Sequence, residues 1–190
     1  MSLLSHHDAQ RFMTTYQQVA IALSVLKGKP IPVDPPLVLA KARKQLQENP
    51  ELLDRAVALM KSRRIRADPE VIEALRQMRL GEWVHLKDLK SGSVLIDIQG
   101  QEAYCVTGLT QPLGVITGRG VCLLEAALCP FAGRIVCDGI LIARCDLGSN
   151  LRRNINDLYR KLKAAGRLHQ SPMTAALWNQ PVRRQPATGC

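Results

Sequence analysis

Apolar residues near the start of the chain recur at helical spacing. The first stripe steps by three or four residues and consists of Phe12, Tyr16, Val19, Leu23 and Leu26. This spacing predicts one apolar face of a helix, because residues three and four apart are neighbours on a helix surface. Gly28 follows the stripe and is expected to end the helix.

Three pairs of an Asx residue and a proline predict three further helices. Asp34-Pro35, Asn49-Pro50 and Asp68-Pro69 each combine a residue suited to capping with a proline in the first turn. The first of these helices should end near Leu46, and Gly81 should end the series. The inward faces of the other two are expected to carry Leu53, Val57 and Met60, and Ile72, Leu75 and Met78 or Leu80. The pattern predicts a small helical layer or bundle.

From Glu82 to Cys145 the pattern changes to short apolar runs separated by glycine. The expected strands are Trp83–Leu86, Ser93–Ile98, Glu102–Val106, Arg134–Cys137 and Ile140–Ala143. Val121–Leu128 fits either a strand or a short helix, because periodicity does not separate the two. Asp138-Gly139 lies between two β-branched runs and predicts a hairpin with a type I′ turn. We expect a small, mostly antiparallel sheet or a partly open barrel of five or six strands.

A last helix is predicted to begin at Ser149 or Asn150 and to run to about Ala165, where Gly166 ends it. Its apolar seam is expected to be Leu151, Ile155, Leu158 and Leu162. Residues 168–190 contain three prolines and little periodicity. They are expected to form a loosely ordered basic tail, in which Ala175–Trp178 docks as a turn of helix.

Together these elements predict an α+β protein. The expected organisation is a helical region over 1–81, a β domain with its C-terminal helix over 82–167, and the tail over 168–190. Aromatic residues make up only 4% of the chain, so the core should consist mostly of Leu, Ile, Val and Ala.

Charge is segregated along the chain, whose formal net charge is +10. Residues 1–80 hold 13 Lys and Arg against 8 Asp and Glu, residues 81–148 hold 5 against 7, and residues 149–190 hold 8 against 1. A near-neutral middle is therefore flanked by two basic regions. This pattern favours a polyanionic partner, with nucleic acid first and an anionic membrane surface second.

Two groups of basic residues are the candidates for that contact. On the last predicted helix, the face opposite the apolar seam carries Arg152, Arg153, Arg160, Lys161, Lys163 and Arg167. Between two predicted helices lie Lys61, Arg63, Arg64 and Arg66. Such side chains would contact phosphates, with an affinity that falls steeply as salt rises. Neither a helix–turn–helix context nor an aromatic stacking platform is evident, so base-specific reading is not expected.

Other function classes find little support in the sequence. No run of apolar residues is long enough to span a membrane, and the N-terminus lacks the pattern of a signal peptide, which favours a cytoplasmic location. The cysteines show no metal-ligand spacing, so no metal and no cofactor are expected.

No catalytic residue is predicted. Gly114–Gly120 is the one glycine-rich segment, and it fits a hairpin or bulge better than a nucleotide-binding loop. His85, Arg119 and Asp138 have polar chemistry, but no spacing brings them together as a nucleophilic or acid–base site.

One segment carries a resemblance to a known family. Residues 128–141 read LCPFAGRIVCDGIL, and a strand followed by Gly108-Leu109 precedes them. Residues 82–145 thereby resemble an uncharacterised bacterial β-domain with a pattern close to LxPFxGxIxxDGxL. The resemblance implies a small β-fold and assigns no chemistry.

The expected function is that of a non-enzymatic module that binds RNA, DNA or another polyanion through the basic helix face and the 61–66 loop. A protein–protein adaptor or regulatory subunit of a bacterial complex is an alternative, with the N-terminal apolar stripe or a sheet edge as its interface. A second alternative is an enzyme with a site near His85, Arg119 and Asp138.

Overall fold

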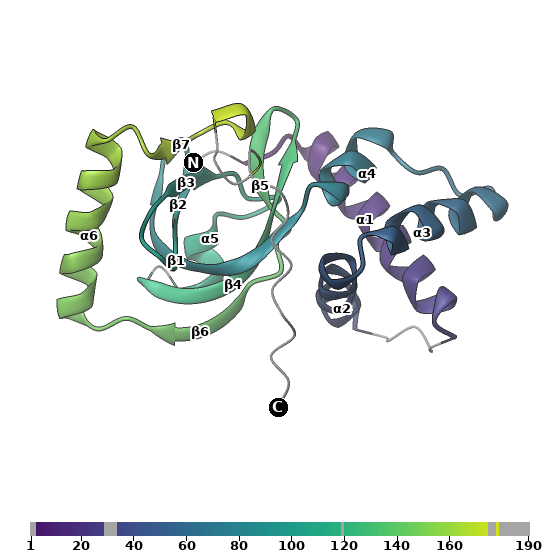
Figure 1. The fold of residues 1–190 in the computed structure, drawn as a ribbon, viewed down its shortest axis with the longest axis horizontal. Coiled ribbons are helices and arrows are strands. Elements are labelled where there is room, and N and C mark those ends of the chain that lie inside the picture. The colour runs from purple at the N-terminus through teal and green to yellow at the C-terminus, as the bar shows by residue number, and fades with distance from the viewer. Residues whose placement is uncertain (1–2, 29–33, 119, 175–177, 179–190) are drawn as a thin grey trace.

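The computed structural model describes residues 3–28, 34–118, 120–174 and 178. Within them, four helices precede the strands of a seven-stranded mixed sheet, a short helix lies between the third and fourth strands, and a long helix lies between the sixth and seventh (Figure 1). The helices are α1 (His6–Leu26), α2 (Pro35–Glu48), α3 (Glu51–Ser62), α4 (Pro69–Arg76), α5 (Leu113–Ile116) and α6 (Ser149–Ala164). The strands are β1 (Arg79–Leu89), β2 (Gly92–Asp97), β3 (Ala103–Val106), β4 (Cys122–Phe131), β5 (Arg134–Cys137), β6 (Ile142–Asp146) and β7 (Leu168–His169). The predicted α+β class is confirmed.

Helix α1 is the centre of the helical layer, where it contacts α2, α3 and α4. Four residues of its predicted stripe are almost completely buried: Phe12, Tyr16, Val19 and Leu23. Phe12 packs against Phe131 of β4, with ring centroids 5.3 Å apart, so the stripe joins the helices to the sheet. The stripe is therefore core, and of the two interfaces named for the adaptor alternative it leaves the sheet edge.

The three predicted helix starts differ in how they are capped. Asp68 accepts hydrogen bonds from the backbone N–H groups of Glu70 and Val71, as an N-cap should. Asp34 takes the N-cap position of α2 without a side-chain cap bond, and the N-cap of α3 is Pro50 rather than Asn49. The inward faces also differ in detail, because Ala56 and Val71 are buried where Val57 and Ile72 were expected.

Strand β1 begins at Arg79, before the predicted change at Glu82 and the predicted strand start at Trp83. It pairs with β2 on one side from Trp83 onward, and with β4 on the other side, where the pairing extends back to Arg79 opposite Leu128. Gly81 lies within the strand rather than ending the helical series. Partner strands distant in sequence set this boundary, so a local pattern does not reveal it.

The strand order is β5-β4-β1-β2-β3-β7, and β6 also pairs with β4. The neighbouring pairs are antiparallel except for β3 and β7, which run parallel. The sheet is open, but it curls enough for Thr107 to form a single parallel bridge to Val136. The helical layer covers one end of this curled sheet, and α6 packs at the other end (Figure 1).

The predicted hairpin at Asp138-Gly139 is wrong. Strand β5 pairs with residues 128–131 of β4, and β6 pairs with residues 122–125 of the same strand, so β5 and β6 follow one another along β4. The tight turn lies instead at Ala132-Gly133, where both residues have positive φ, at 50° and 68°. Of Val121–Leu128, which was ambiguous in the sequence, all residues from Cys122 onward belong to β4.

The glycine-rich segment also differs from expectation. Residues Leu113–Ile116 form the short helix α5 rather than a hairpin or bulge. Strand β7 lies within the predicted tail, where it pairs with β3, and a 3₁₀ turn covers Pro172–Thr174. Further on, the Trp178 indole N–H donates to the Gln77 carbonyl at 2.8 Å. The rest of the predicted tail and Ala175–Leu177 lie outside the described residues.

Candidate nucleic-acid interface

Helix α6 is fixed to the sheet by three buried residues: Ile155, Tyr159 and Leu162. They pack with Leu86, Val94 and Ile96 of the first two strands in one core cluster. This seam is rotated relative to the predicted one, because Tyr159 replaces Leu151, which is 46% exposed. The amino group of Lys87 lies 4.4 Å from the centre of the Tyr159 ring, so a cation of β1 lies beside the buried face of α6.

The helix ends in a Schellman motif. The N–H of Arg167 donates to the Leu162 carbonyl at 2.8 Å, and the N–H of Gly166 donates to the Lys163 carbonyl at 3.2 Å. Gly166 has a φ of 70°, a conformation that glycine adopts without steric strain. Beyond it, the carbonyl of Arg167 accepts from the N–H of Ala103, so the end of α6 is joined to the sheet.

The outer face of α6 is basic and exposed, as predicted. Its exposed cations are Arg152, Arg153, Arg160, Lys161 and Lys163, followed by Arg167. Two of them have acidic partners, since Arg160 pairs with Asp157 at 3.2 Å and Arg167 with Glu102 at 2.8 Å. The other four make no ion pair or side-chain hydrogen bond within the residues that the structure describes. The positive charge of α6 therefore faces solvent largely uncompensated.

The second basic group lies at the C-terminal end of α3. Lys61, Arg63, Arg64 and Arg66 are all exposed. None has an acidic partner among residues 3–28, 34–118, 120–174 and 178. Lys61, Arg64 and Arg66 line an open hollow of about 380 Å³, together with Val57, Ile65 and Ala67. We name this group the α3 basic turn.

The two basic groups do not converge on one surface. Helix α6 forms one end of the molecule along its longest axis, and the α3 basic turn projects at the other end, beyond α1 and α4 (Figure 1). The sheet lies between them, in the near-neutral stretch of the chain. The helix face and the loop of the sequence-based hypothesis are thus two separate surfaces.

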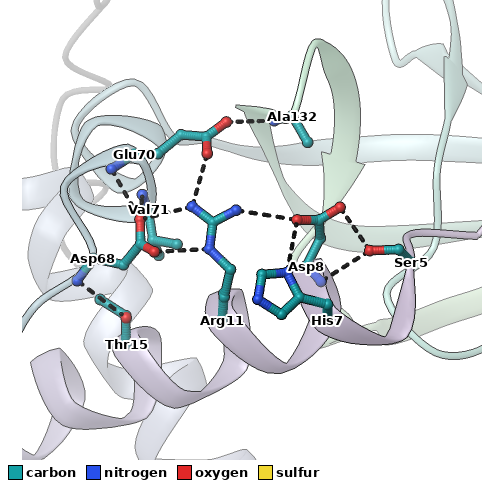
Figure 2. A network of polar contacts seen from close by, with 9 residues as sticks. All are labelled: Ser5, His7, Asp8, Arg11, Thr15, Asp68, Glu70, Val71 and Ala132. Carbon is teal, nitrogen blue, oxygen red and sulfur yellow. Dashed lines mark hydrogen bonds and ion pairs between the residues drawn. The ribbon is translucent and has the colours of Figure 1, made fainter.

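Asp68 and Glu70, the acidic residues that follow the α3 basic turn in the chain, belong to a network around Arg11 (Figure 2). Arg11 donates to Asp68 at 2.8 Å, to Glu70 at 2.9 Å and to Asp8 at 3.1 Å. The guanidinium lowers the pKa of the Asp68 carboxyl. Glu70 also accepts from the N–H of Ala132, so the network joins α1, α4 and the β4–β5 turn. The carboxylates of this network therefore pair with Arg11, and that of Asp68 also caps α4.

A buried cluster around Arg43 joins α2 to the sheet. The Arg43 side chain is 0% exposed and contacts Glu125 of β4 at 2.8 Å and Asp138 at 3.3 Å. It also donates to the carbonyl of Ile140. Burial raises the pKa of Asp138 to about 6, against the opposing effect of Arg43. This arginine was not predicted, although it lies four residues after Leu39 and three before Leu46, at the spacing of one helix face.

His85 and Asp138, the two described residues of the enzyme alternative, belong to different side-chain clusters. The His85 ring contacts Thr117 and Asp88, each at 3.3 Å, while Asp138 belongs to the Arg43 cluster. His85 is 1% exposed, and Asp88 also accepts from Ser93 and from the N–H of Gly114, so this cluster fixes α5 to the β1–β2 hairpin. Arg119 lies outside the described residues.

The cysteines of the sheet are buried in apolar surroundings, with the exception of the exposed Cys145. Burial raises the pKa of the Cys129 and Cys137 thiols, which disfavours the thiolate needed for nucleophilic attack or metal binding. Within the described residues, no group of three or more His, Cys, Asp or Glu could hold a metal ion. No described helix is long and apolar enough to cross a membrane.

Comparison with protein-family models, with curated proteins and with solved structures gave no match for this chain. The resemblance of residues 82–145 to a bacterial β-domain therefore stays an expectation. Function has to be inferred from the geometry and charge of the molecule itself.

Proposed function

We propose that this protein binds double-stranded nucleic acid through the outer face of α6. The supporting observation is the row of exposed cations along one helix, four of which have no acidic partner in the described structure. The helix itself is held to the sheet by its apolar seam, so the cations are presented on a fixed element.

The chemistry of this face suits phosphates better than bases. Sixteen residues of helix extend about 24 Å, a length along which a duplex offers about seven base pairs of backbone. Tyr159, the aromatic residue of α6, is buried against the sheet and offers no stacking surface. Binding is therefore expected to be insensitive to sequence and sensitive to salt.

The test measures binding of a labelled duplex of about 12 base pairs by fluorescence anisotropy between about 50 and 200 mM salt. One arm uses DNA and the other RNA of the same sequence. Each lost phosphate contact lowers the salt slope by about 0.9, so the triple variant Arg152→Gln, Arg160→Gln and Lys163→Gln should bind more weakly with a slope reduced by about 2–3.

A control variant removes the same charge elsewhere. Lys27→Gln, Lys41→Gln and Arg55→Gln change exposed residues just after α1, in α2 and in α3, and they should leave binding nearly unchanged. Equal weakening by both triple variants would show that net charge alone drives binding. The absence of any salt-sensitive binding by the native protein would rule out the proposed function.

A further inference from the structure

The α3 basic turn has the composition of a ligand surface rather than of a balanced loop. Four of the six residues from 61 to 66 are cations, and the other two, Ser62 and Ile65, carry no charge. The nearby carboxylates of Asp68 and Glu70 are held by Arg11, as Figure 2 shows. The turn therefore keeps its positive charge although acidic residues follow it in the sequence.

The backbone of this turn is strained at an arginine. Helix α3 ends in the same Schellman motif as α6, with the N–H of Ile65 donating to the Met60 carbonyl and the N–H of Arg64 donating to the Lys61 carbonyl. Arg64 has a φ of 60° at the position where α6 has Gly166. Glycine would suit this conformation better, so the side chain of Arg64 is present at a conformational cost. Strain of this kind is frequent where a side chain serves binding.

From these observations we propose that the α3 basic turn is a second phosphate-binding surface and that one molecule bridges two duplexes. This inference rests on the proposed function of α6. The two surfaces lie at opposite ends of the longest axis, so a short duplex bound to α6 leaves the α3 basic turn free for another (Figure 1). Lys61, Arg64 and Arg66 surround one hollow and can approach the same stretch of backbone.

Bridging is measured by capture. A short biotinylated duplex, fixed to beads, is incubated with protein and washed, and a second, fluorescent duplex of the same length is added. The native protein should capture the fluorescent duplex and bind two duplexes per chain. Sedimentation of the protein alone at the same concentration establishes whether the bridging species is a single chain.

The decisive variant combines Arg63→Gln, Arg64→Gly and Arg66→Gln. It should still bind one duplex through α6, with unchanged affinity at that surface, while capture of the second duplex is lost. Arg64→Gly relieves the positive φ, so the variant should fold as well as the native chain, and its unfolding midpoint checks this. The control triple at Lys27, Lys41 and Arg55 should retain capture.

The outcomes separate the two proposals. One duplex per chain without capture, while binding still depends on α6, would overturn bridging and leave the proposed function intact. Two duplexes per chain that persist in the α3 basic turn variant, or capture by a self-associated protein alone, would also overturn it. A native protein that binds no duplex would remove both proposals.

Discussion

The arginines at the junction between helices and sheet differ from those of α6 in their partners. Arg43 is fully buried and contacts two carboxylates, and Arg11 is partly buried and contacts three. Arg152 and Arg153 of α6 are exposed and have no acidic partner in the described part of the chain. At the junction, carboxylates thus neutralise the charge of the guanidinium groups. On α6 the same group is free to contact a ligand.

This difference indicates where the net charge can act. Cations that hold elements together are matched by carboxylates, because a buried charge without a partner is strongly destabilising. Within the described residues, four of the six cations on the α6 face and all four of the α3 basic turn lack such partners, and so they are the residues with charge available for a polyanion. Three predictions test this contrast, beginning with the largest expected effect on stability.

Replacing Arg43 with Met should have the largest effect. The substitution leaves Asp138 and Glu125 with far less positive charge nearby, since Lys44 lies 3.9 Å from Glu125 and is half exposed. Removing one partner of a buried ion pair typically costs about 3–5 kcal/mol in the free energy of unfolding. Urea denaturation followed by circular dichroism measures this loss.

A neutralised cluster provides the matched control for Arg43→Met. The combination of Arg43→Met, Glu125→Gln and Asp138→Asn removes the uncompensated charges, so it should recover a large part of the lost stability. A loss below about 1 kcal/mol in the single variant would show that Arg43 contributes no more to stability than an exposed arginine. The difference drawn between the junction and α6 would then be wrong.

The titration of Asp138 should cause the next largest change in the free energy of unfolding. Its pKa is about 6 in the folded protein, above its ordinary value of 3.8. Between these values the folded state binds more protons than the unfolded state, so this carboxyl makes the free energy of unfolding fall as pH rises from about 4 to 6. The free energy of unfolding of Asp138→Asn, taken relative to that of the native protein, should therefore increase by on the order of 1–3 kcal/mol from pH 4 to pH 7.

Denaturation of both proteins at several pH values checks this gain. In an Arg43→Met background the fall should extend to higher pH, because the guanidinium opposes the rise in the pKa of Asp138. A stability difference between Asp138→Asn and the native protein that stays constant from pH 4 to 7 would contradict the prediction.

The helices of eight or more residues were predictable because their signals are local, whereas the four-residue α5 was not predicted. The period of three or four residues located the buried stripe of α1, and Gly166 marked the end of α6 correctly. The seam of α6 was misplaced because an amphipathic tyrosine was not counted as core, although Tyr159 is 6% exposed. Helix existence was thus easier to predict than helix orientation.

The sheet was less predictable because its pairing is set by distant residues. Asp138-Gly139 has the composition of a hairpin turn, but β4 is long enough to pair with the strands on both sides of it, and Asp138 contacts Arg43. The basic candidates of α6 were correctly expected to be exposed. Their separation from the α3 basic turn was not visible, because it depends on how the helical layer and α6 are placed around the sheet.

The smallest of the three effects is expected for Arg11→Gln. The Arg11 side chain is 30% exposed, and its partner Glu70 is 47% exposed, so solvent and salt screen the contacts that Figure 2 shows. The substitution should lower the unfolding midpoint less than Arg43→Met does, and the loss should shrink in 1 M salt, while that of Arg43→Met should persist. Its pH dependence should have the opposite sign to that of Asp138, because Arg11 lowers the pKa of Asp68 and this stabilisation is lost as pH falls. Thermal unfolding at low and high salt and at several pH values, with Arg55→Gln as an exposed control that has no ion pair among the described residues, measures all three changes. A loss as large and as salt-independent as that of Arg43→Met would show that the Arg11 network behaves as buried, and that the junction is uniformly shielded from solvent.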